Sequence, residues 1–552
     1  MPYFKLTVNN VQASPSWMLA RAINSRDNSH MTTLDFNEAF PSEQIVSASS
    51  LTLNLPRPPK RFYRHGWQSW SLAAWTDLNP LPIQKPTLLH PMQIDPVYAK
   101  EKQPHGSWVG AVEFENGKIL LLGSLGLDAH VLLNGSHLEG KYKAGDGEWF
   151  IAYGDGLEVF SKYADELGKR FGEKTNKAAP RVWCSWYSLY TAIDESMLCK
   201  IFDELGDLPF DVLQVDDGWQ KKIGDWEANE KFPSGMKALA DKIKSTGHKA
   251  GLWLAPLIAV KSSKLFREHP DWFLKNARGK FVSAGFNWGE QLYALDTTHP
   301  AVLDWLAALM KQVRAWGFDY LKLDFLYGSA LPGRHHLEIP RETAYRNGLK
   351  VLREAMGKDA FFLACGAPIL PSLGLCDAMR IGPDVSAAWE DHLESILLYN
   401  PTTPTTKNAI RTTINRLWLS PLAQTDPDVV YFRSNEISLT SDQKSLLQDL
   451  ALVCDFRATS DLPQRLTDDQ RKSLRLFLEC KPTIKQTSPY VFKIDERIVD
   501  FSPAMPLPKP PAGFDAVLGK IAGCLGNYGW AIKIVDMLKL NVIEKMKKKL
   551  VI

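Results

Sequence analysis

The stretch Leu321-Lys-Leu-Asp-Phe-Leu-Tyr327 contains a short apolar run that ends at a carboxylate, Asp324. The arrangement returns 60 residues later, where Arg380-Ile-Gly-Pro-Asp384 places Asp384 after a second run. Each pattern predicts a buried strand that gives way to a loop at the acidic residue. Catalytic side chains of a (β/α)8 barrel lie at such strand ends, and this separation is long enough for two turns of the barrel. The pair therefore predicts a β/α barrel with both carboxylates at its mouth.

Residues 181–460 alternate between short apolar runs and segments with helical spacing. This alternation is typical of a (β/α)8 TIM barrel. A doubly wound sheet is the competing fold, but no G-x-G-x-x-G motif follows a strand. Helical stripes are expected around residues 236–243, 302–316 and 345–356. The expected strands are residues 212–215, 251–254, 320–323, 361–364, 378–381 and 429–432.

The flanking regions differ from this pattern. Short runs near residues 51–55, 108–112, 118–122 and 129–133 are separated by Gly, Asn and Pro, which predicts an antiparallel β-sandwich. The expected division is an N-terminal β-sandwich domain at 1–178, a catalytic barrel at 179–460 and a C-terminal domain at 461–552. We expect the C-terminal domain to be a β-sandwich, although it contains a proline-rich linker and a basic end that could be helical.

Composition excludes several classes of partner. The 552 residues contain 65 Lys and Arg against 62 Asp and Glu, so no global charge points to nucleic acid. No apolar stretch is long enough to span a membrane, and we expect no membrane partner. Seven cysteines occur without C-x-x-C spacing. This pattern predicts a reducing, cytoplasmic location without a disulfide framework or a structural zinc site.

Asp216 and Asp217 stand side by side in Gln214-Val-Asp-Asp-Gly-Trp219, directly after an expected strand. Adjacent carboxylates repel each other, so a cation, a metal ion or a set of hydroxyl groups must compensate for their charge. Sugar hydroxyls suit this role, because each carboxylate oxygen can accept a hydrogen bond from one. A helix N-cap with a solvated neighbour is the structural alternative. A metal site is disfavoured, since no histidine lies nearby at ligand spacing.

Lys322 and Asp324 lie on the same face of their expected strand, because they are two residues apart. The lysine should lower the pKa of Asp324 and keep it ionised, as a glycosyl nucleophile requires. A structural ion pair at the strand end is the alternative interpretation. A Schiff-base role for Lys322 is disfavoured, because the neighbouring anion would keep the amine protonated.

Asp384 follows Arg380 and stands directly after Pro383, which fixes the backbone and helps to aim the carboxyl group. A general acid needs a raised pKa to hold its proton near neutrality. An ionised Asp324 nearby would raise the pKa of Asp384 until the nucleophile is consumed, after which Asp384 could act as a base. A loop-capping role is the alternative. Two carboxyl groups with these properties are suited to cleaving a glycosidic bond.

The chain contains 18 tryptophans. Most should lie in cores, because the indole ring buries a large area. A flat ring can also complement the C–H face of a sugar. The candidates for sugar contact stand beside polar residues at strand ends, namely Trp186, Trp219 and Trp253.

Eight motifs, in order and at similar spacing, resemble those of the retaining α-galactosidases of glycoside hydrolase family 36. The likeness extends from about residue 60 to residue 435. It implies an N-terminal β-supersandwich, a central (β/α)8 barrel and a small C-terminal β-domain. The motifs are Trp183-Cys-Ser-Trp-Tyr187, Gln214-Val-Asp-Asp-Gly-Trp219, Ile223-Gly-Asp-Trp226, Gly251-Leu-Trp-Leu-Ala-Pro256, Tyr293-Ala-Leu-Asp296, Lys322-Leu-Asp-Phe325, Cys365-Gly366 and Arg380-Ile-Gly-Pro-Asp384.

The resemblance implies a role for each matching residue. Asp324 would be the nucleophile and Asp384 the acid/base, while Asp216 and Asp217 would hold the 4- and 6-hydroxyls of galactose. The other implied substrate contacts are Lys322 and Arg380 near ring hydroxyls and the nucleophile, Trp186 and Trp253 as pocket walls, Cys365 and Gly366 on a wall loop, and Trp70, lent by the N-terminal domain.

The activity implied is that of a retaining exo-α-galactosidase acting on melibiose, raffinose and galactomannan fragments, without a metal or cofactor. A galactosyl transferase of the raffinose-synthase kind and an α-N-acetylgalactosaminidase remain alternatives. A non-catalytic sugar-binding protein is disfavoured, because a lectin has no use for an acid/base pair.

Overall fold

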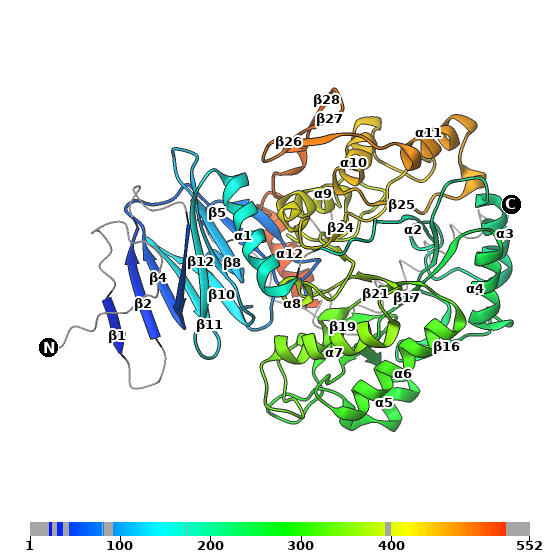
Figure 1. The fold of residues 1–552 in the computed structure, drawn as a ribbon, viewed down its shortest axis with the longest axis horizontal. Coiled ribbons are helices and arrows are strands. Elements are labelled where there is room, and N and C mark those ends of the chain that lie inside the picture. The colour runs from blue at the N-terminus through cyan, green and yellow to red at the C-terminus, as the bar shows by residue number, and fades with distance from the viewer. Residues whose placement is uncertain are drawn as a thin grey trace.

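A computed structural model describes residues 21–24, 30–36, 43–79, 81, 92–172, 174–391 and 399–525, and the structural statements below concern these residues. Figure 1 shows a β-rich N-terminal part beside a larger part in which strands alternate with helices. A small sheet and a helix follow near the C-terminal end of the described chain.

Two six-stranded sheets form the N-terminal part. They pack face to face through alternating apolar side chains, and Gly140 shows how close the approach is. A Cβ atom at Gly140 would lie 2.7 Å from the Trp149 ring of the other sheet. Helix α1 (Gly156–Phe171) packs on the second sheet. The first sheet has the order β1 (Arg21–Asn24), β2 (His30–Asp35), β4 (Ser50–Asn54), β11 (His137–Tyr142), β10 (Ala129–Asn134), β7 (His105–Ser107). The second has the order β3 (Glu43–Ala48), β12 (Gly147–Gly154), β9 (Ile119–Ser124), β8 (Val109–Glu113), β5 (Arg61–His65), β6 (Ala73–Thr76).

The central part contains one curled parallel sheet of eight strands. Its two ends approach each other, because Val430, shortly after the first strand in the order, forms a parallel bridge with Thr459 on the last. This arrangement is consistent with the expected barrel. The strand order is β24 (Gln424–Asp426), β23 (Ala378–Arg380), β22 (Phe361–Ala364), β21 (Tyr320–Leu323), β17 (Lys249–Leu254), β14 (Val212–Val215), β13 (Arg181–Cys184), β25 (Arg457–Thr459).

Amphipathic helices connect these strands. Helix α6 (Pro300–Trp316) buries Val302, Leu306 and Val313 on one stripe, begins with a proline and ends at Gly317, whose φ of 102° suits a glycine. The other helices of this part are α2 (Trp186–Leu189), α3 (Glu195–Leu205), α4 (Gly235–Ser245), α5 (Lys264–Glu268), α7 (Arg341–Met356), α8 (Ile369–Ser372), α9 (Thr406–Asn415), α10 (Ser441–Cys454) and α11 (Asp468–Glu479). Additional strands outside the parallel sheet are β15 (Gln220–Lys222), β16 (Asp225–Ala228), β18 (Ile258–Val260), β19 (Ser283–Asn287) and β20 (Glu290–Ala294).

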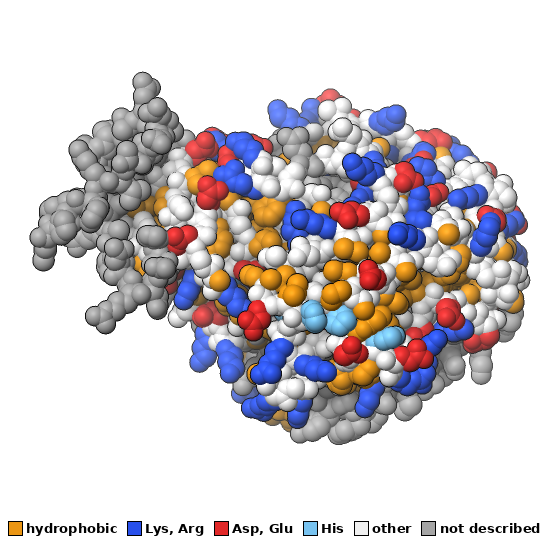
Figure 2. Space-filling view, turned by 60° about the horizontal axis from the view of Figure 1, so that its bottom comes forward, with side chains coloured by type: hydrophobic (Ala, Val, Ile, Leu, Met, Phe, Trp, Pro, Cys, Tyr) orange, Lys and Arg blue, Asp and Glu red, His pale blue; other side chains and the backbone are white. Residues whose placement is uncertain are grey.

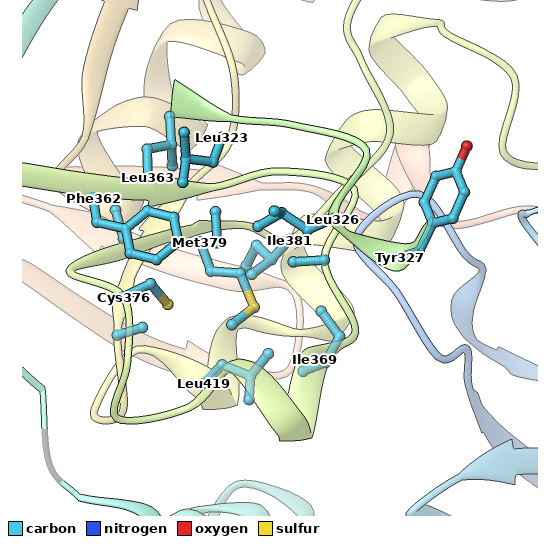
Figure 3. Packing of buried hydrophobic residues seen from close by; sticks show 14 of the residues in the cluster. Leu323, Leu326, Tyr327, Phe362, Leu363, Ile369, Cys376, Met379, Ile381 and Leu419 are labelled. Atoms are coloured by element: carbon cyan, nitrogen blue, oxygen red, sulfur yellow. The ribbon is translucent and has the colours of Figure 1, made fainter. Parts of the chain in front are cut away.

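The parallel strands are buried on both faces, which explains why they read as continuous apolar runs. Figure 3 shows Phe362 of β22 and Met379 of β23 on the side of the strands that faces Ile369 and Leu419, whereas Leu363 lies beside Leu323 on the other side. This packing holds the strands in register, and their carboxyl ends are thereby fixed relative to one another.

One expected strand was wrong. Residues 429–432 form no strand; the seventh strand along the chain is β24 (Gln424–Asp426), which is short and polar. Apolar runs identify strands that are covered on both faces, whereas the side chains of β24 are buried in polar contacts. Asp426, for example, accepts a hydrogen bond from Arg380.

The C-terminal part differs from the expected β-sandwich. The residues described there contain a single three-stranded antiparallel sheet of β26 (Ile484–Ser488), β27 (Val491–Ile494) and β28 (Arg497–Asp500), followed by helix α12 (Gly513–Leu525). The helix considered for residues 528–552 lies outside the described residues. No helix in the described part of the chain is both long and apolar enough to cross a membrane.

Candidate active site

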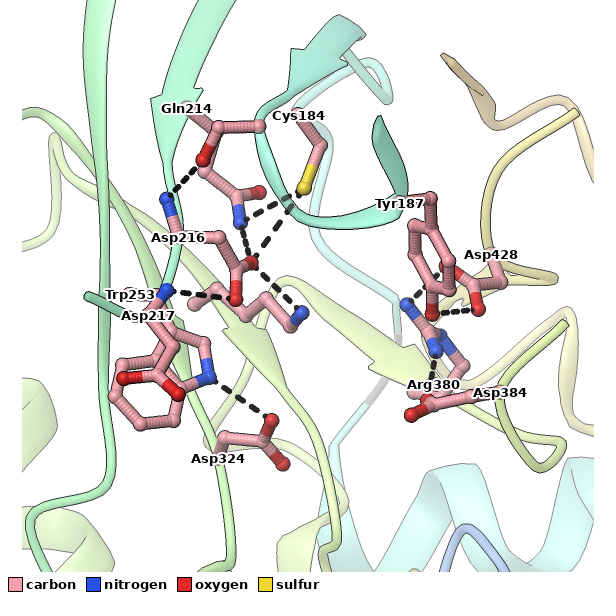
Figure 4. A network of polar contacts seen from close by, with 12 residues as sticks. Cys184, Tyr187, Gln214, Asp216, Asp217, Trp253, Asp324, Arg380, Asp384 and Asp428 are labelled. Atoms are coloured by element: carbon pink, nitrogen blue, oxygen red, sulfur yellow. Dashed lines mark hydrogen bonds and ion pairs between the residues drawn. The ribbon is translucent and has the colours of Figure 1, made fainter. Parts of the chain in front are cut away.

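Most of the predicted site residues lie at the carboxyl ends of several parallel strands (Figure 4). Asp216 and Asp217 follow β14, Asp324 follows β21, and Asp384 follows β23 after three intervening residues. Parallel strands present their carboxyl ends at one edge, so residues far apart in the sequence are brought together there.

Asp324 is held by two N–H donors. Trp253 Nε1 donates to Asp324 Oδ2 at 2.9 Å, and the backbone N–H of Phe325 donates to Oδ1 at 2.8 Å. Phe325 has a φ of 53°, which turns the chain immediately after Asp324. The two donors hold the carboxyl group in a fixed orientation, as a nucleophile requires.

Asp384 has a different environment. Its side chain is 33% exposed and pairs with Arg380, whose Nη1 lies 2.9 Å from Asp384 Oδ1. Desolvation by the surrounding protein raises the pKa of Asp384, and the charges of Asp324 and Asp216 raise it further against the opposing effect of Arg380 and Lys322. In Figure 4 the carboxyl groups of Asp324 and Asp384 face the same space from opposite sides. Asp384 therefore retains its proton more readily than an ordinary aspartate.

Lys322 pairs with a different carboxylate from the one expected. Its Nζ lies 3.0 Å from Asp216 Oδ2, whereas Asp324 receives its hydrogen bonds from two N–H groups. Asp216 Oδ2 also accepts from Gln214 Nε2 at 2.5 Å. The long lysine side chain reaches from β21 across β17 to β14, a contact that residue spacing along one strand could not reveal.

Asp217 is bound by a residue that the sequence analysis missed. Trp288 Nε1 donates to Asp217 Oδ2 at 2.7 Å, and Gln220 Nε2 donates to Oδ1 at 2.6 Å. Burial raises the pKa of Asp217 to about 6. Trp288 lies in the turn between β19 and β20 with a φ of 51°. The feature of the local sequence that stands out beside Trp288 is Gly289, which indicates a turn but does not indicate a contact with Asp217.

The candidate tryptophans separate into two groups. Trp253 is almost fully buried but binds Asp324 directly, and the half-buried Trp186 follows the carboxyl end of β13. Trp219 is instead fully buried: its Nε1 donates to the Trp253 carbonyl oxygen at 3.0 Å and its ring packs against Trp316. The expectation that Trp219 contacts a sugar is therefore wrong, because no part of its side chain is exposed; it supports Trp253 from behind.

The N-terminal part contributes Trp70 to the site. The loop between β5 and β6 forms a bridge from Gln68 to Pro368, and the Trp70 ring packs edge-on against Phe325. Gly366 permits this approach, because its φ is 52° and a Cβ atom there would lie 3.1 Å from the Trp70 ring. Cys365, directly before it, is buried, and burial raises the pKa of its thiol well above the usual range.

Arg380 is surrounded by three carboxylates. Its Nε, Nη1 and Nη2 bind Asp426, Asp384 and Asp428 at 2.9, 2.9 and 2.8 Å. Tyr187 Oη also donates to Asp428. Asp426, Asp428 and Tyr187 are further residues of this cluster that the sequence patterns did not predict; the acidic stretch Asp426-Pro-Asp428 is the local signal for the first two. Within the described residues, no group of His, Cys, Asp and Glu is arranged to hold a metal ion.

Comparison with known proteins identifies the family. The Melibiase family profile matches residues 141–356. The solved α-galactosidase TtGalA of Thermus thermophilus, in complex with p-nitrophenyl α-D-galactopyranoside, is 41% identical with a TM-score of 0.80; the match covers 89% of this chain and 100% of that one. The chain belongs to the α-galactosidases of glycoside hydrolase family 36.

The structure of TtGalA in complex with stachyose is 44% identical with a TM-score of 0.75; the match covers 79% of this chain and 94% of that one. α-Galactosidase AgaA of Geobacillus stearothermophilus is 30% identical over 37% of this chain. The matched stretch spans 30% of the AgaA sequence, and 24% and 26% of two relatives from Pediococcus pentosaceus.

Proposed function

We propose that this protein is a retaining exo-α-galactosidase that releases terminal galactose from oligosaccharides such as melibiose, raffinose and galactomannan fragments. The observation that carries the proposal is the contrast between Asp324 and Asp384. Asp324 is buried and held by two N–H donors, whereas Asp384 is partly exposed and desolvation raises its pKa. Family membership supports the substrate class, since a relative has been solved with stachyose.

In the first step, Asp324 attacks the anomeric carbon while Asp384 donates its proton to the glycosidic oxygen. The bond to the leaving group breaks, and a covalent β-galactosyl ester forms on Asp324. This step requires the two carboxyl groups to lie about 5–5.5 Å apart. Arg380 stabilises the carboxylate that Asp384 becomes after giving up its proton.

In the second step, Asp384 accepts a proton from a water molecule that attacks the same carbon and releases Asp324. Ester formation has removed the charge of Asp324, which is one of the causes that raise the pKa of Asp384. The pKa of Asp384 therefore falls when the group must act as a base. Two displacements return the α anomer.

Substrate recognition is assigned to Asp216 and Asp217, which we propose accept hydrogen bonds from two galactose hydroxyls. Both carboxylates are oriented by neighbours, Asp216 by Lys322 and Asp217 by Trp288. Trp70, Trp186 and Trp253 would surround the ring. Residues Cys365 and Gly366 would form the adjoining wall.

The proposed organisation is an N-terminal β-supersandwich to residue 178, a (β/α)8 barrel and a small C-terminal domain. Helix α11 (Asp468–Glu479) follows the last parallel strand, which favours ending the barrel near residue 480 instead of 460.

Neither a nucleic acid nor a membrane is proposed as a partner. On the face shown in Figure 2, Lys and Arg side chains are interspersed with Asp and Glu and form no single basic patch. A cytoplasmic location is proposed from the spacing of the seven cysteines.

Azide rescue tests the two catalytic assignments separately. The wild-type protein should hydrolyse 4-nitrophenyl α-galactoside, and Asp324→Gly should abolish turnover. Azide should restore activity to Asp324→Gly with β-galactosyl azide as the product, because it attacks from the face that the nucleophile occupied. Rescue of Asp384→Gly should give the α-azide instead, because azide then attacks the galactosyl ester.

The azide products are identified by NMR. Normal turnover by Asp324→Gly would contradict its assignment as the nucleophile. Product analysis at high raffinose concentration distinguishes hydrolysis from transfer, because a transferase yields longer oligosaccharides from the same intermediate.

A further inference from the structure

A buried carboxylate, Asp428, lies behind the partly exposed Asp384. Its side chain has no exposed surface. Asp428 Oδ1 accepts from Arg380 Nη2 at 2.8 Å, and Oδ2 accepts from the backbone N–H of Val385 at 2.9 Å and from Tyr187 Oη. Three donors therefore converge on one carboxylate that the proposed reaction does not use.

Two of these donors belong to the immediate surroundings of Asp384. Arg380 binds Asp384 through Nη1, and Val385 is the next residue in the chain. Asp384 lies in residues 381–391, which form neither helix nor strand. No backbone ladder fixes its position, so contacts such as those made by Asp428 must do so.

The cluster also affects the proton on Asp384. Arg380 is shared among three carboxylates, so an ionised Asp428 draws on the charge that would otherwise stabilise ionised Asp384. Burial raises the pKa of Asp428 to about 7, and Arg380 opposes this effect. The titratable and charged groups that interact with Asp428 are Arg380, Asp384, Asp426, Lys322, Tyr187, Tyr431 and Cys184.

We propose that Asp428, together with Tyr187, is a positioning residue that aims the Asp384 carboxyl group and keeps it protonated for glycosidic bond cleavage. This inference rests on the proposed role of Asp384 as the general acid. Asp428 acts through Arg380 and the Val385 backbone and does not itself touch the substrate.

The test uses Asp428→Asn. Asn tolerates the positive φ of 83° at this position and keeps the shape of the side chain. Its oxygen can still accept from Arg380, but its NH2 group cannot accept from Val385 or Tyr187. The sugar leaving group of melibiose must be protonated as it departs, whereas nitrophenolate is stable enough to depart with little help from an acid. We therefore expect kcat/KM to fall about 100-fold for melibiose and far less for 4-nitrophenyl α-galactoside.

The pH profile gives a second readout that a purely structural role would not change. Without the charge of Asp428, Arg380 stabilises ionised Asp384 more strongly, and the pKa of Asp384 falls. The basic limb of kcat/KM for melibiose should therefore move to lower pH in Asp428→Asn. Tyr187→Phe, which removes one donor without a change of charge, should give the same substrate bias at smaller amplitude, and it provides the test if Asp428→Asn does not fold.

Asp377→Asn is the matched control. Asp377 is also buried and accepts from an arginine, Arg353, and from a backbone N–H, that of Phe362, but it precedes β23 at the opposite end of the strand. The Asp377→Asn variant should lower the Tm without changing the ratio of kcat/KM for melibiose to that for 4-nitrophenyl α-galactoside. Equal losses on both substrates with an unchanged pH profile in Asp428→Asn, or the same bias in Asp377→Asn, would overturn the proposal. If the proposed role of Asp384 as the general acid is itself wrong, Asp384→Ala will also lower kcat/KM equally for melibiose and 4-nitrophenyl α-galactoside. That result distinguishes a failure of the proposed function from a failure of this inference.

Discussion

The site cluster around Arg380 and a second cluster around Arg341 have the same composition, one arginine with three carboxylates. Arg341, at the start of α7, pairs with Asp95, whose Oδ1 lies 2.9 Å from Arg341 Nη1. Glu342 Oε2 accepts from Trp108 Nε1 at 2.9 Å and from the Asp128 N–H at 2.7 Å. These contacts join the N-terminal part to the central part.

The two clusters differ in exposure. All the side chains of the Arg341 cluster are at least 91% buried, whereas Asp384 is 33% exposed. A carboxyl group that reaches solvent can exchange its proton with a substrate; one enclosed between two parts of a protein can only hold them together. Residue types alone therefore do not distinguish a reactive cluster from a structural one.

The largest expected effect separates the clusters by activity. Asp384→Ala should lower kcat/KM for raffinose by about 10²–10⁴-fold, because general acid catalysis is lost. The Tm should change little, since the removed group is partly solvated and its salt bridge is with Arg380, which keeps two other carboxylate partners. Kinetics and calorimetry measure the two quantities, and a large loss of Tm with normal turnover would place Asp384 among the structural carboxylates.

Arg341→Met should lower the stability of the protein but not its activity, the opposite of the result expected for Asp384→Ala. Removing one partner from a buried ion pair leaves uncompensated charge and costs about 3–5 kcal/mol of unfolding free energy. The kcat of the protein that remains folded should be unchanged. Denaturant unfolding provides the measurement.

Arg346→Met is the control on the same helix. Arg346 donates to the carbonyl oxygens of Pro371 and Leu373 and leaves no charge unpaired when removed. Its loss of stability should be smaller. Similar losses in Arg341→Met and Arg346→Met would contradict the structural role of the charged cluster.

The smallest expected effect is on pH dependence. Burial raises the pKa of Glu342 to about 8, so the folded protein binds more protons than the unfolded chain from about pH 4.5, where an unfolded glutamate titrates, to pH 8. Stability from this group is therefore present at low pH and lost as the pH rises through 8. The Tm of the wild type relative to Glu342→Gln should fall by a few degrees between pH 5 and pH 8.5.

Glu354→Gln, at an exposed position of the same helix, should show no such trend. A Tm difference between wild type and Glu342→Gln that is constant with pH would mean that Glu342 is ionised in the folded protein. Asp128 would then be the carboxyl group that carries the proton of the cluster.

Local patterns predicted much of the fold and part of the site. Runs such as residues 320–323 and 361–364 match β21 and β22, because most residues of a strand covered on both faces are apolar. Strand β24 is buried but polar, so a search for apolar runs did not find it. Asp324 and Asp384 were recognisable because each is an acidic residue close to the end of such a run.

Neighbours along the chain specify most of the buried strands and the acidic residues that follow them. The partners of those residues depend on the tertiary structure: Lys322 lies with Asp216, Trp288 with Asp217, and Asp428 behind Asp384. Side chains that reach across strands meet according to how the sheet curls. That curvature arises from packing over the whole central part, and no local spacing records it.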